Sequence, residues 1–396
     1  MQILTRQKKS FSEIAASHVN VGIEIEKMRV DSNEKLSKKR FPGQLSAEIR
    51  PYVQREFFTS MCEFVFPPKT DATENIAKIN EVMEQIDEEL GESETLWAYS
   101  CPPNLPDDPS EIEISAEPRN KIWYRNKLSQ IYDVRRIMNT GVHLNLSFSD
   151  EALESIMSSD KFADENDLYL HVAQQFLRYR WLFTYLFGAT PTVHENYLDE
   201  KLTIPPMRSV RNSPYGFPTS IVGDYSSVEA YVGNIEWAVA VGNLLQPSQY
   251  YEGVRFKGEP GSKLDSILTE GIDHLEIRFF DLNPFTFSGV TEEQIRLVQV
   301  MALYFTQTER IHPSMLETVL SVARWMNTTV ALEDPLQKCL YEKDGMELLG
   351  NVYCFAVVNE LDEKYLTAIS NYMGCFENCA DNLSAQVLDK RNTVKV

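Results

Sequence analysis

The sequence predicts an α+β fold built around a largely antiparallel β-sheet. First, long amphipathic helices alternate irregularly with short strands, so the regular strand–helix–strand rhythm of a parallel sheet is missing. Second, several strand-like runs are apolar on one face and polar on the other, as in antiparallel sheets with one face packed on a core. Third, hydrophobic residues make up 43% of the 396 residues and aromatic residues 11%, which is ample for a packed core and excludes a disordered chain.

Helices are predicted where apolar residues recur at spacings of three and four. In residues 73–90, Ile79, Met83 and Leu90 fall on one face, and Gly91 follows as a stop signal. Further helices are expected at residues 164–187, 226–245, 291–305 and 362–373. Loops marked by Gly and Pro are expected at residues 211–220 and 257–263. No internal repeat, low-complexity tract or clear linker divides the sequence, which favours a single domain.

The first predicted strand, GIEIEKMRV at residues 22–30, carries two glutamates on one face. Side chains alternate across a strand, so Glu24 and Glu26 project from one side and Ile23 and Ile25 from the other. Adjacent carboxylates repel each other and weaken a sheet. The glutamate face is therefore either fully solvated or covered by a positively charged group.

Three further runs combine an apolar face with a polar one. Their polar side chains are His143, Asn145 and Ser147 in TGVHLNLSF, Glu276 and Arg278 in HLEIRFFDLNPF, and Glu63 in MCEFVF. If the four strands belong to one sheet, these side chains converge with the two glutamates on one surface. The alternative for each strand alone is a half-exposed strand with its polar face in water.

The joint pattern favours a site for divalent cations and phosphate. Mg²⁺ prefers carboxylate oxygens and leaves coordination positions open to the phosphates of a substrate, while an arginine suits the phosphate charge. The implied class is Mg-nucleotide chemistry. The sequence contains neither GxxxxGK[ST] nor GxGxxG, so it supports neither a P-loop nor a Rossmann fold.

Charge and hydropathy exclude several partners. With 38 basic against 58 acidic residues, the net charge of -20 argues against broad contact with nucleic acid or anionic lipid. The longest apolar run, WLFTYLFGA, is shorter than a membrane span, and the first twenty residues lack the apolar core of a signal peptide. We expect a cytoplasmic protein whose partners are small molecules, with no nucleic-acid or membrane partner.

The sequence contains six cysteines, which we expect to be free thiols because disulfides are unusual in a large intracellular chain. Cys375 and Cys379 in CFENC have a spacing that fits half of a metal site, but no second Cys or His pair stands nearby. The alternative is that these two cysteines occupy successive turns of one helix.

Over residues 20–390 the sequence resembles the bacterial glutamate-cysteine ligases, and especially the ligase half of bifunctional glutathione synthetases. It carries, in the family's order, GIEIEKMRV, REFFTSMCEFVFPP, LWAYSCPPNLP, WYRNKL, TGVHLNLSF, RYRWLFTYLFGATP, RSVRNSPYGF, YYEGVRFKG and LEIRFFDLNPF. The resemblance implies a fold similar to glutamine synthetase, in which helices surround an antiparallel sheet curved into a funnel. It also implies that residues 1–396 form one catalytic ligase domain for glutathione biosynthesis, without an ATP-grasp domain.

The resemblance also implies the chemistry. ATP, as co-substrate, phosphorylates the γ-carboxylate of L-glutamate, and the amine of L-cysteine or another amino acid attacks the acyl phosphate. Mg²⁺ or Mn²⁺ neutralises the charge that develops during transfer. The metal ligands implied by motif position are Glu24, Glu26, Glu56, Glu63, His143 and Glu276. The family usually has aspartate in place of Glu56, and the extra methylene moves the ligand oxygen.

Other site residues follow from the same resemblance. Arg278 and Glu276 are the implied catalytic residues, and Arg278, Arg255 and Lys257 the implied phosphate contacts. Arg211 resembles the arginine that binds a substrate carboxylate. The implied substrate-binding residues are Asn145 and, around the acceptor amino acid, Tyr124, Tyr251, Phe57, Leu128, Ile137 and Phe217. The alternatives are that the arginines form surface salt bridges and that the tyrosines and leucine belong to the core.

Two acceptor-pocket residues depart from the family. Phe217 stands where the family usually has tyrosine, and Ile137 where it usually has glutamine. Both changes remove polar groups, so the acceptor is either cysteine or a small apolar or non-proteinogenic amino acid. Two other functional hypotheses remain: a non-catalytic regulatory relative, and a phosphotransferase that phosphorylates without ligating.

Overall fold

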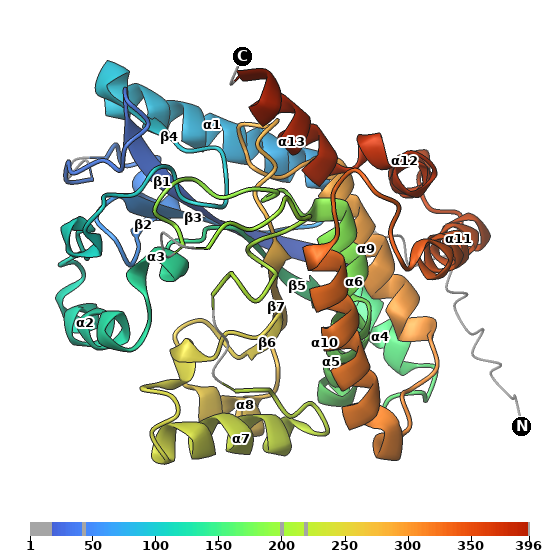
Figure 1. The fold of residues 1–396 in the computed structure, drawn as a ribbon. Helices are drawn as coiled ribbons and strands as arrows, with labels where there is room; N and C mark the ends of the chain where they lie inside the picture. The colour runs from blue at the N-terminus through green and yellow to red at the C-terminus, as the bar shows by residue number, and fades with distance from the viewer. Residues whose placement is uncertain (1–17, 42–44, 199–201, 218–220, 395–396) are drawn as a thin grey trace, which may run out of the picture.

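The structure, a computed structural model, describes residues 18–41, 45–198, 202–217 and 221–394. A twisted sheet crosses the middle of the molecule, α1 lies above it, and α5, α6, α9 and α10 stand on one side (Figure 1). The strands are β1 (Val19–Asp31), β2 (Val53–Arg55), β3 (Met61–Lys69), β4 (Glu94–Leu96), β5 (Val142–Phe148), β6 (Val254–Lys257) and β7 (His274–Phe280). The helices are α1 (Ala72–Leu90), α2 (Ile122–Ile131), α3 (Val134–Ile137), α4 (Asp150–Met157), α5 (Glu165–Arg178), α6 (Arg180–Phe187), α7 (Val228–Ala240), α8 (Ile267–Glu270), α9 (Glu292–Gln307), α10 (Leu316–Leu332), α11 (Glu342–Val358), α12 (Glu363–Glu377) and α13 (Leu383–Val394). The predicted α+β class is confirmed.

The sheet has the strand order β2-β3-β1-β5-β7-β6, and β4 pairs with the end of β1. Each of these pairings is antiparallel, as the sequence predicted. The sheet is open, with β2 and β6 at its edges. The register shifts between Val21 and Ile23 and again between Val142 and Leu144. Such irregularities increase the local twist and bend a sheet.

One face of the sheet forms the main hydrophobic core. Ile23, Ile25, Leu144 and Ile277 are at most 1% exposed and belong to one continuous apolar cluster. Helices α1, α5, α6 and α9 pack against the strands on this side. The faces predicted to be apolar are therefore buried, which leaves the opposite faces available for the polar side chains.

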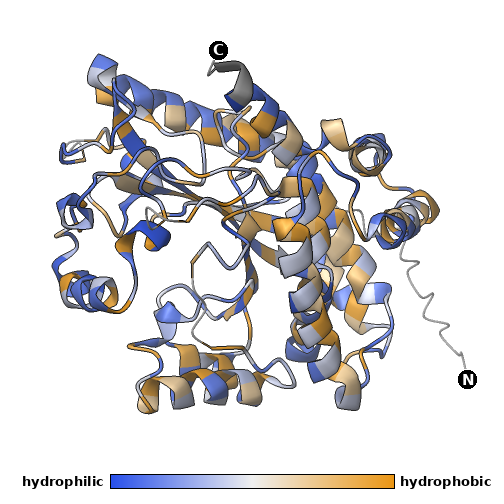
Figure 2. Ribbon diagram, in the orientation of Figure 1, coloured by the Kyte–Doolittle hydropathy of each residue, from blue (hydrophilic) through white to orange (hydrophobic). Residues whose placement is uncertain are grey.

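Local signals set the ends of the predicted helices. The Asp71 side chain accepts hydrogen bonds from the backbone of Thr73 and Glu74 at the start of α1, and Gly91 follows its end with φ +64°. Along α1, hydrophilic and hydrophobic residues alternate as an amphipathic helix requires (Figure 2). Gly242, with φ +83°, lies just beyond α7, which ends before the predicted residue 245.

The prediction of one helix over residues 164–187 is wrong. The backbone leaves the helical conformation at Tyr179 (φ −102°, ψ 14°), which separates α5 from α6. Both helices are apolar enough to be buried, but α5 packs against both α9 and α10, whereas α6 packs mainly against α10 and β7. A continuous apolar pattern does not reveal a change of direction that packing decides.

A second apolar cluster lies on the glutamate face of β1. Met28 and Val30 continue the side of β1 that carries Glu24 and Glu26, and both are buried in this cluster together with residues of α2 and α3. The strand therefore leads from a charged region directly into an apolar one. Among the described helices, none is long and apolar enough to cross a membrane.

The six cysteines are free thiols, as predicted. Cys375 and Cys379 do not lie on one helix, because α12 ends at Glu377 and Cys379 begins a separate short 3₁₀ helix. In the described part of the chain, neither cysteine belongs to a group of side chains able to share a metal ion.

Candidate active site

Strands β3, β1, β5 and β7 are neighbours, and their register brings the predicted polar side chains together. Glu26 stands opposite Glu63, Glu24 opposite His143, and Asn145 opposite Glu276. A one-residue slip of any strand would turn these side chains into the apolar core. The apolar alternation that buries the other face thus fixes the position of the site.

His143 lies at the centre of the carboxylates. Its Nδ1 atom is 3.3 Å from Glu24 Oε2 and 3.9 Å from Glu276 Oε1. Two sets of side chains have potential ligand atoms within 4.8 Å of one another, and His143 belongs to both: one includes Glu24 and Glu276, the other Glu26 and Glu63. The donor set of oxygens and one imidazole suits a divalent cation such as Mg²⁺ or Mn²⁺.

Buried atoms without partners support the fit to a cation. His143 Nε2 and Asn145 Oδ1 are buried and have no hydrogen-bond partner among the described residues. His143 is 2% exposed, and burial, helped by the charge of Arg278, lowers its pKa to about 4. The imidazole is therefore neutral at pH 7, which is the form that binds a metal.

The carboxylates on β1 and β3 repel one another. Burial and the neighbouring Glu56 carboxylate raise the pKa of Glu26 to about 7, and the same two causes raise that of Glu63 well above its ordinary value. Glu56 accepts a hydrogen bond from the backbone N–H of Phe57 and lies outside both sets of converging ligand atoms. In this arrangement the carboxylates hold either protons or a cation.

Glu276 has a different environment, because cations surround it. Arg278 Nη1 donates to its Oε1 at 2.7 Å, and Arg255 and Lys257 lie 3.5 and 3.6 Å from its Oε2. Burial alone would raise the pKa of Glu276, but these cations and His143 hold it well below its ordinary value. Glu276 thus links the carboxylate–histidine cluster to a row of positive charges.

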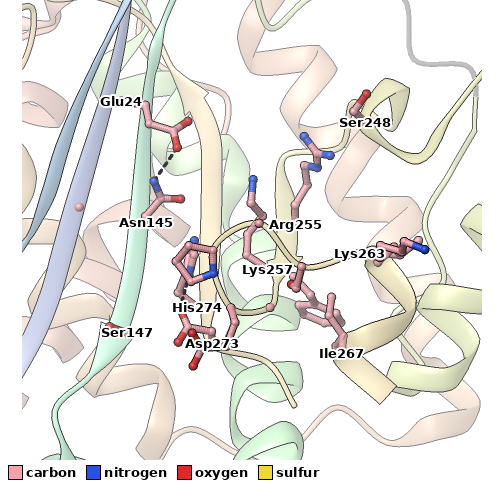
Figure 3. A pocket seen from close by; sticks show the side chains of 18 of the residues that line it. Glu24, Asn145, Ser147, Ser248, Arg255, Lys257, Lys263, Ile267, Asp273 and His274 are labelled. Carbon is pink, nitrogen blue, oxygen red and sulfur yellow. Dashed lines mark hydrogen bonds and ion pairs between the residues drawn. The ribbon is translucent and has the colours of Figure 1, made fainter. Parts of the chain in front are cut away.

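The row of charges opens into a cavity of about 690 Å³, a volume typical of small-molecule sites. Glu24 and Asn145 line one end, joined by a 3.0 Å hydrogen bond, and Arg255 and Lys257 extend from β6 beside them (Figure 3). Further lining side chains, which the sequence did not identify as site residues, are Ser147, Ser248, Lys263, Ile267, Asp273 and His274. Of these side chains, the sequence placed Ser147 on the polar face of its predicted strand and Lys263 in the Gly/Pro-marked loop at 257–263, and it singled out none of the others.

The residues assigned to the acceptor pocket also gather in one place. Phe57, Leu128 and Ile137 are buried in the second apolar cluster, and Tyr124 and Phe217 pack against it. The Phe217 ring lies 4.0 Å from the Tyr251 ring, and the Arg278 guanidinium stands 5.7 Å from the centre of the latter. The acceptor-pocket residues therefore adjoin the cations at Glu276.

Arg211 lies beside this junction. Its Nη2 atom donates to the backbone carbonyl of Arg278 at 2.9 Å, and its charge favours ionisation of Glu26. The structure thus brings Arg211 into contact with β7 and close to the carboxylate cluster. Sequence reasoning had no means of placing this loop residue relative to the sheet.

The sequence matches proteins of known families. A family model described as glutamate-cysteine ligase matches residues 4–243 and 223–321. The glutathione biosynthesis bifunctional protein GshAB of Streptococcus thermophilus (strain CNRZ 1066) is 30% identical over 377 residues, which cover 93% of this chain and 49% of that protein. The GshAB protein of Streptococcus mutans is 32% identical over 338 residues, which cover 83% of this chain and 44% of that protein. This chain spans about half the length of these relatives.

Solved structures share the fold. A bifunctional glutathione synthetase from Pasteurella multocida superposes with a TM-score of 0.84 at 24% identity, covering 99% of this chain and 51% of that one. A glutamate-cysteine ligase from Francisella tularensis, solved in complex with AMP, has a TM-score of 0.83 at 20% identity, with 95% and 85% covered. At these identities the superpositions establish the fold, while the matched family model establishes the family. The chain therefore belongs to the glutamate-cysteine ligase family.

Proposed function

We propose that the protein is an ATP-dependent ligase that joins the γ-carboxylate of L-glutamate to the amine of an amino acid, through a γ-glutamyl phosphate. The leading acceptor is L-cysteine, because the family and the Francisella ligase are both named for glutamate and cysteine. One observation carries the proposal: Glu276 joins the carboxylate–histidine cluster to Arg278, Arg255 and Lys257 at the edge of a cavity. This arrangement suits a metal-bound triphosphate, and the Francisella ligase was solved with AMP.

The carboxylate cluster is the proposed metal site. A bound Mg²⁺ or Mn²⁺ would neutralise the charge that develops on the transferred phosphoryl group. The residues that would hold it are Glu24, Glu26, Glu63, His143 and Glu276, with Glu56 nearby. His143 is neutral at pH 7 and Glu276 is ionised, so both are in the state that binds a cation.

The cations and the apolar cluster have separate tasks in this proposal. Arg255 and Lys257 bind triphosphate oxygens along the cavity, and Arg278, between Glu276 and Tyr251, stabilises the phosphoryl group as it passes to glutamate. Arg211 holds a carboxylate of glutamate. The apolar cluster around Phe57 and Leu128 keeps water from the acyl phosphate, which would otherwise hydrolyse.

We also propose that the described residues form a single catalytic domain that acts in the cytoplasm. One sheet and one main hydrophobic core extend from β1 to the helices near the end of the chain. The free cysteines suit a reducing compartment.

A phosphate-release screen tests the proposed reaction. With ATP, Mg²⁺ and glutamate, we expect phosphate release only when an amino acid acceptor is added, together with a γ-glutamyl dipeptide in equal amount. Phosphate release with glutamate alone and no dipeptide would indicate a phosphotransferase. No release with any acceptor, in a protein that still binds ATP, would indicate a non-catalytic relative.

The apolar surroundings of Phe217 favour a second candidate, in which the acceptor is a small apolar or non-proteinogenic amino acid. Phe217 packs against Tyr251 and, at 5.4 Å, Tyr132, and Ile137 is 8% exposed in the same cluster. Neither side chain can hydrogen-bond an acceptor. A pocket that has lost two such groups discriminates less strongly between side chains of similar size.

For this candidate we expect kcat/KM for cysteine to lie within about a hundredfold of the values for 2-aminobutyrate, alanine and valine, since one or two methylenes supply no more. The Phe217→Tyr variant, which adds only a hydroxyl group, serves as the matched comparison and should increase discrimination. A cysteine preference far above a hundredfold in the unmodified enzyme would refute a retuned pocket and leave cysteine as the acceptor.

A further inference from the structure

Next to Arg211 lies a buried carboxylate, that of Asp281, to which the proposed reaction assigns no role. Asp281 directly follows β7 and is 1% exposed. Its Oδ2 atom accepts hydrogen bonds from the backbone N–H of Ala189 at 2.8 Å, the Thr190 hydroxyl at 2.8 Å and the Ser209 hydroxyl at 2.9 Å. Its Oδ1 atom lies 3.9 Å from Arg211 Nη1.

The same carboxylate also holds the backbone around Arg211. The Thr190 hydroxyl, which donates to Asp281, accepts from the Arg211 backbone N–H at 3.2 Å. The Ser209 hydroxyl likewise donates to Asp281 and accepts from the Asn212 backbone N–H at 3.1 Å. Asp281 therefore fixes both ends of the arginine: the side chain through charge, and the backbone through two hydroxyl groups.

Gly141 restricts the position of the Arg211 guanidinium. A Cβ atom at this position would lie 2.4 Å from Arg211 Nη2 and 2.5 Å from its Cζ. The guanidinium thus lies directly against the backbone just before β5, the strand that carries His143. Any side chain at position 141 would displace the guanidinium.

We propose that Asp281 and Gly141 are positioning residues that hold Arg211 in the orientation needed to bind a carboxylate of the glutamate substrate. The proposal rests on the proposed function. Arg211 Nη2 is committed to the Arg278 carbonyl and Nη1 faces Asp281, so the side chain cannot rotate without losing both contacts. A planar guanidinium can bind a carboxylate through two parallel bonds, and binding is tighter when its orientation is already fixed, because less side-chain entropy is lost. These two residues therefore act through Arg211 and do not touch the substrate.

The test uses the full chain with ATP and Mg²⁺. In Asp281→Asn, an amide N–H₂ group replaces one oxygen and faces the donors of Arg211. We expect KM for glutamate to rise roughly 10- to 100-fold, as for a weakened hydrogen bond to a charged group, while KM for ATP changes by less than about threefold. The rise in melting temperature that glutamate causes in the unmodified protein should be lost in the same variant. Gly141→Ala leaves Asp281 unchanged and should likewise raise KM for glutamate but not KM for ATP. If Asp281→Asn does not fold, Gly141→Ala alone tests the proposal.

Glu333→Gln is the matched control, because Glu333 accepts from the buried Arg208 at 2.8 Å outside the site. It should leave KM for glutamate unchanged. In the double variant Asp281→Asn/Arg211→Lys, KM for glutamate should be no higher than in Arg211→Lys alone, since both changes affect one interaction. If both positioning variants keep the normal KM for glutamate, or raise both KM values equally, the inference is wrong although the ligase stands. If the unmodified protein neither binds glutamate nor releases phosphate, the proposed function fails together with the inference.

Discussion

Replacing Glu276 by Gln is expected to lower the rate of dipeptide formation by roughly 10³-fold or more, the scale seen when a charge-stabilising group of phosphoryl transfer is lost. Among the described residues, Glu276 is the carboxylate that contacts His143 as well as Arg278, Arg255 and Lys257. The amide would weaken the metal site and release the three cations from their common partner. Steady-state turnover with saturating ATP, glutamate and acceptor measures the loss.

The variant should also lose stability, which distinguishes Glu276 from Glu26. Without the Glu276 carboxylate, three cations face a neutral amide, so we expect a lower melting temperature at pH 7. Glu26 should behave in the opposite way. Its pKa rises from the ordinary 4.5 to about 7 on folding, so the folded state binds the extra proton between these values and Glu26 destabilises the metal-free protein above pH 7.

Glu26→Gln is therefore expected to lower turnover strongly and yet raise the melting temperature of the metal-free protein at pH 8, with a smaller difference at pH 5, where Glu26 is mostly protonated in the folded state. Thermal unfolding at both pH values, in the presence of a chelator, makes the comparison. If the Glu26→Gln protein is unfolded at pH 8, this carboxylate is required for folding and the prediction is wrong.

Removal of divalent metal is expected to abolish turnover, and millimolar Mg²⁺ or Mn²⁺ should restore it. Zinc should not be required, because the proposed ligands are four carboxylates and one imidazole, with no thiolate. The affinity for Mg²⁺ should fall as the pH drops below about 7, since Glu26 must release a proton before it binds a cation.

The rise in melting temperature on adding Mg²⁺, measured at pH 6 and pH 8, reports this dependence without relying on activity. The shift should be larger at pH 8. Full turnover after complete removal of divalent metal would refute the metal site, and an equal Mg²⁺-induced shift at both pH values would refute the role of Glu26 in it.

The sequence was sufficient to predict the sheet and the polar face of its central strands. Side chains alternate with a period of two, so the apolar residues beside Glu24, His143 and Glu276 also determine which way these polar residues point. Resemblance to the family added the residues that no periodicity marks, such as Arg211 and Phe217. The structure places both beside the predicted surface, next to Arg278 and Tyr251.

The sequence by itself determined what alternation and helical spacing encode: the α+β class, the strands that carry the carboxylates, and the helix of residues 73–90. Only the tertiary structure decided the break at Tyr179, the place of Ser248 and His274 in the cavity wall, and the contacts of Asp281 and Gly141 with Arg211. The physical reason is the distance along the sequence over which each kind of contact acts. A strand or helix pattern depends on residues a few positions apart, whereas Asp281 meets Arg211 across 70 residues of sequence, and no local preference records which loop packs beneath which strand.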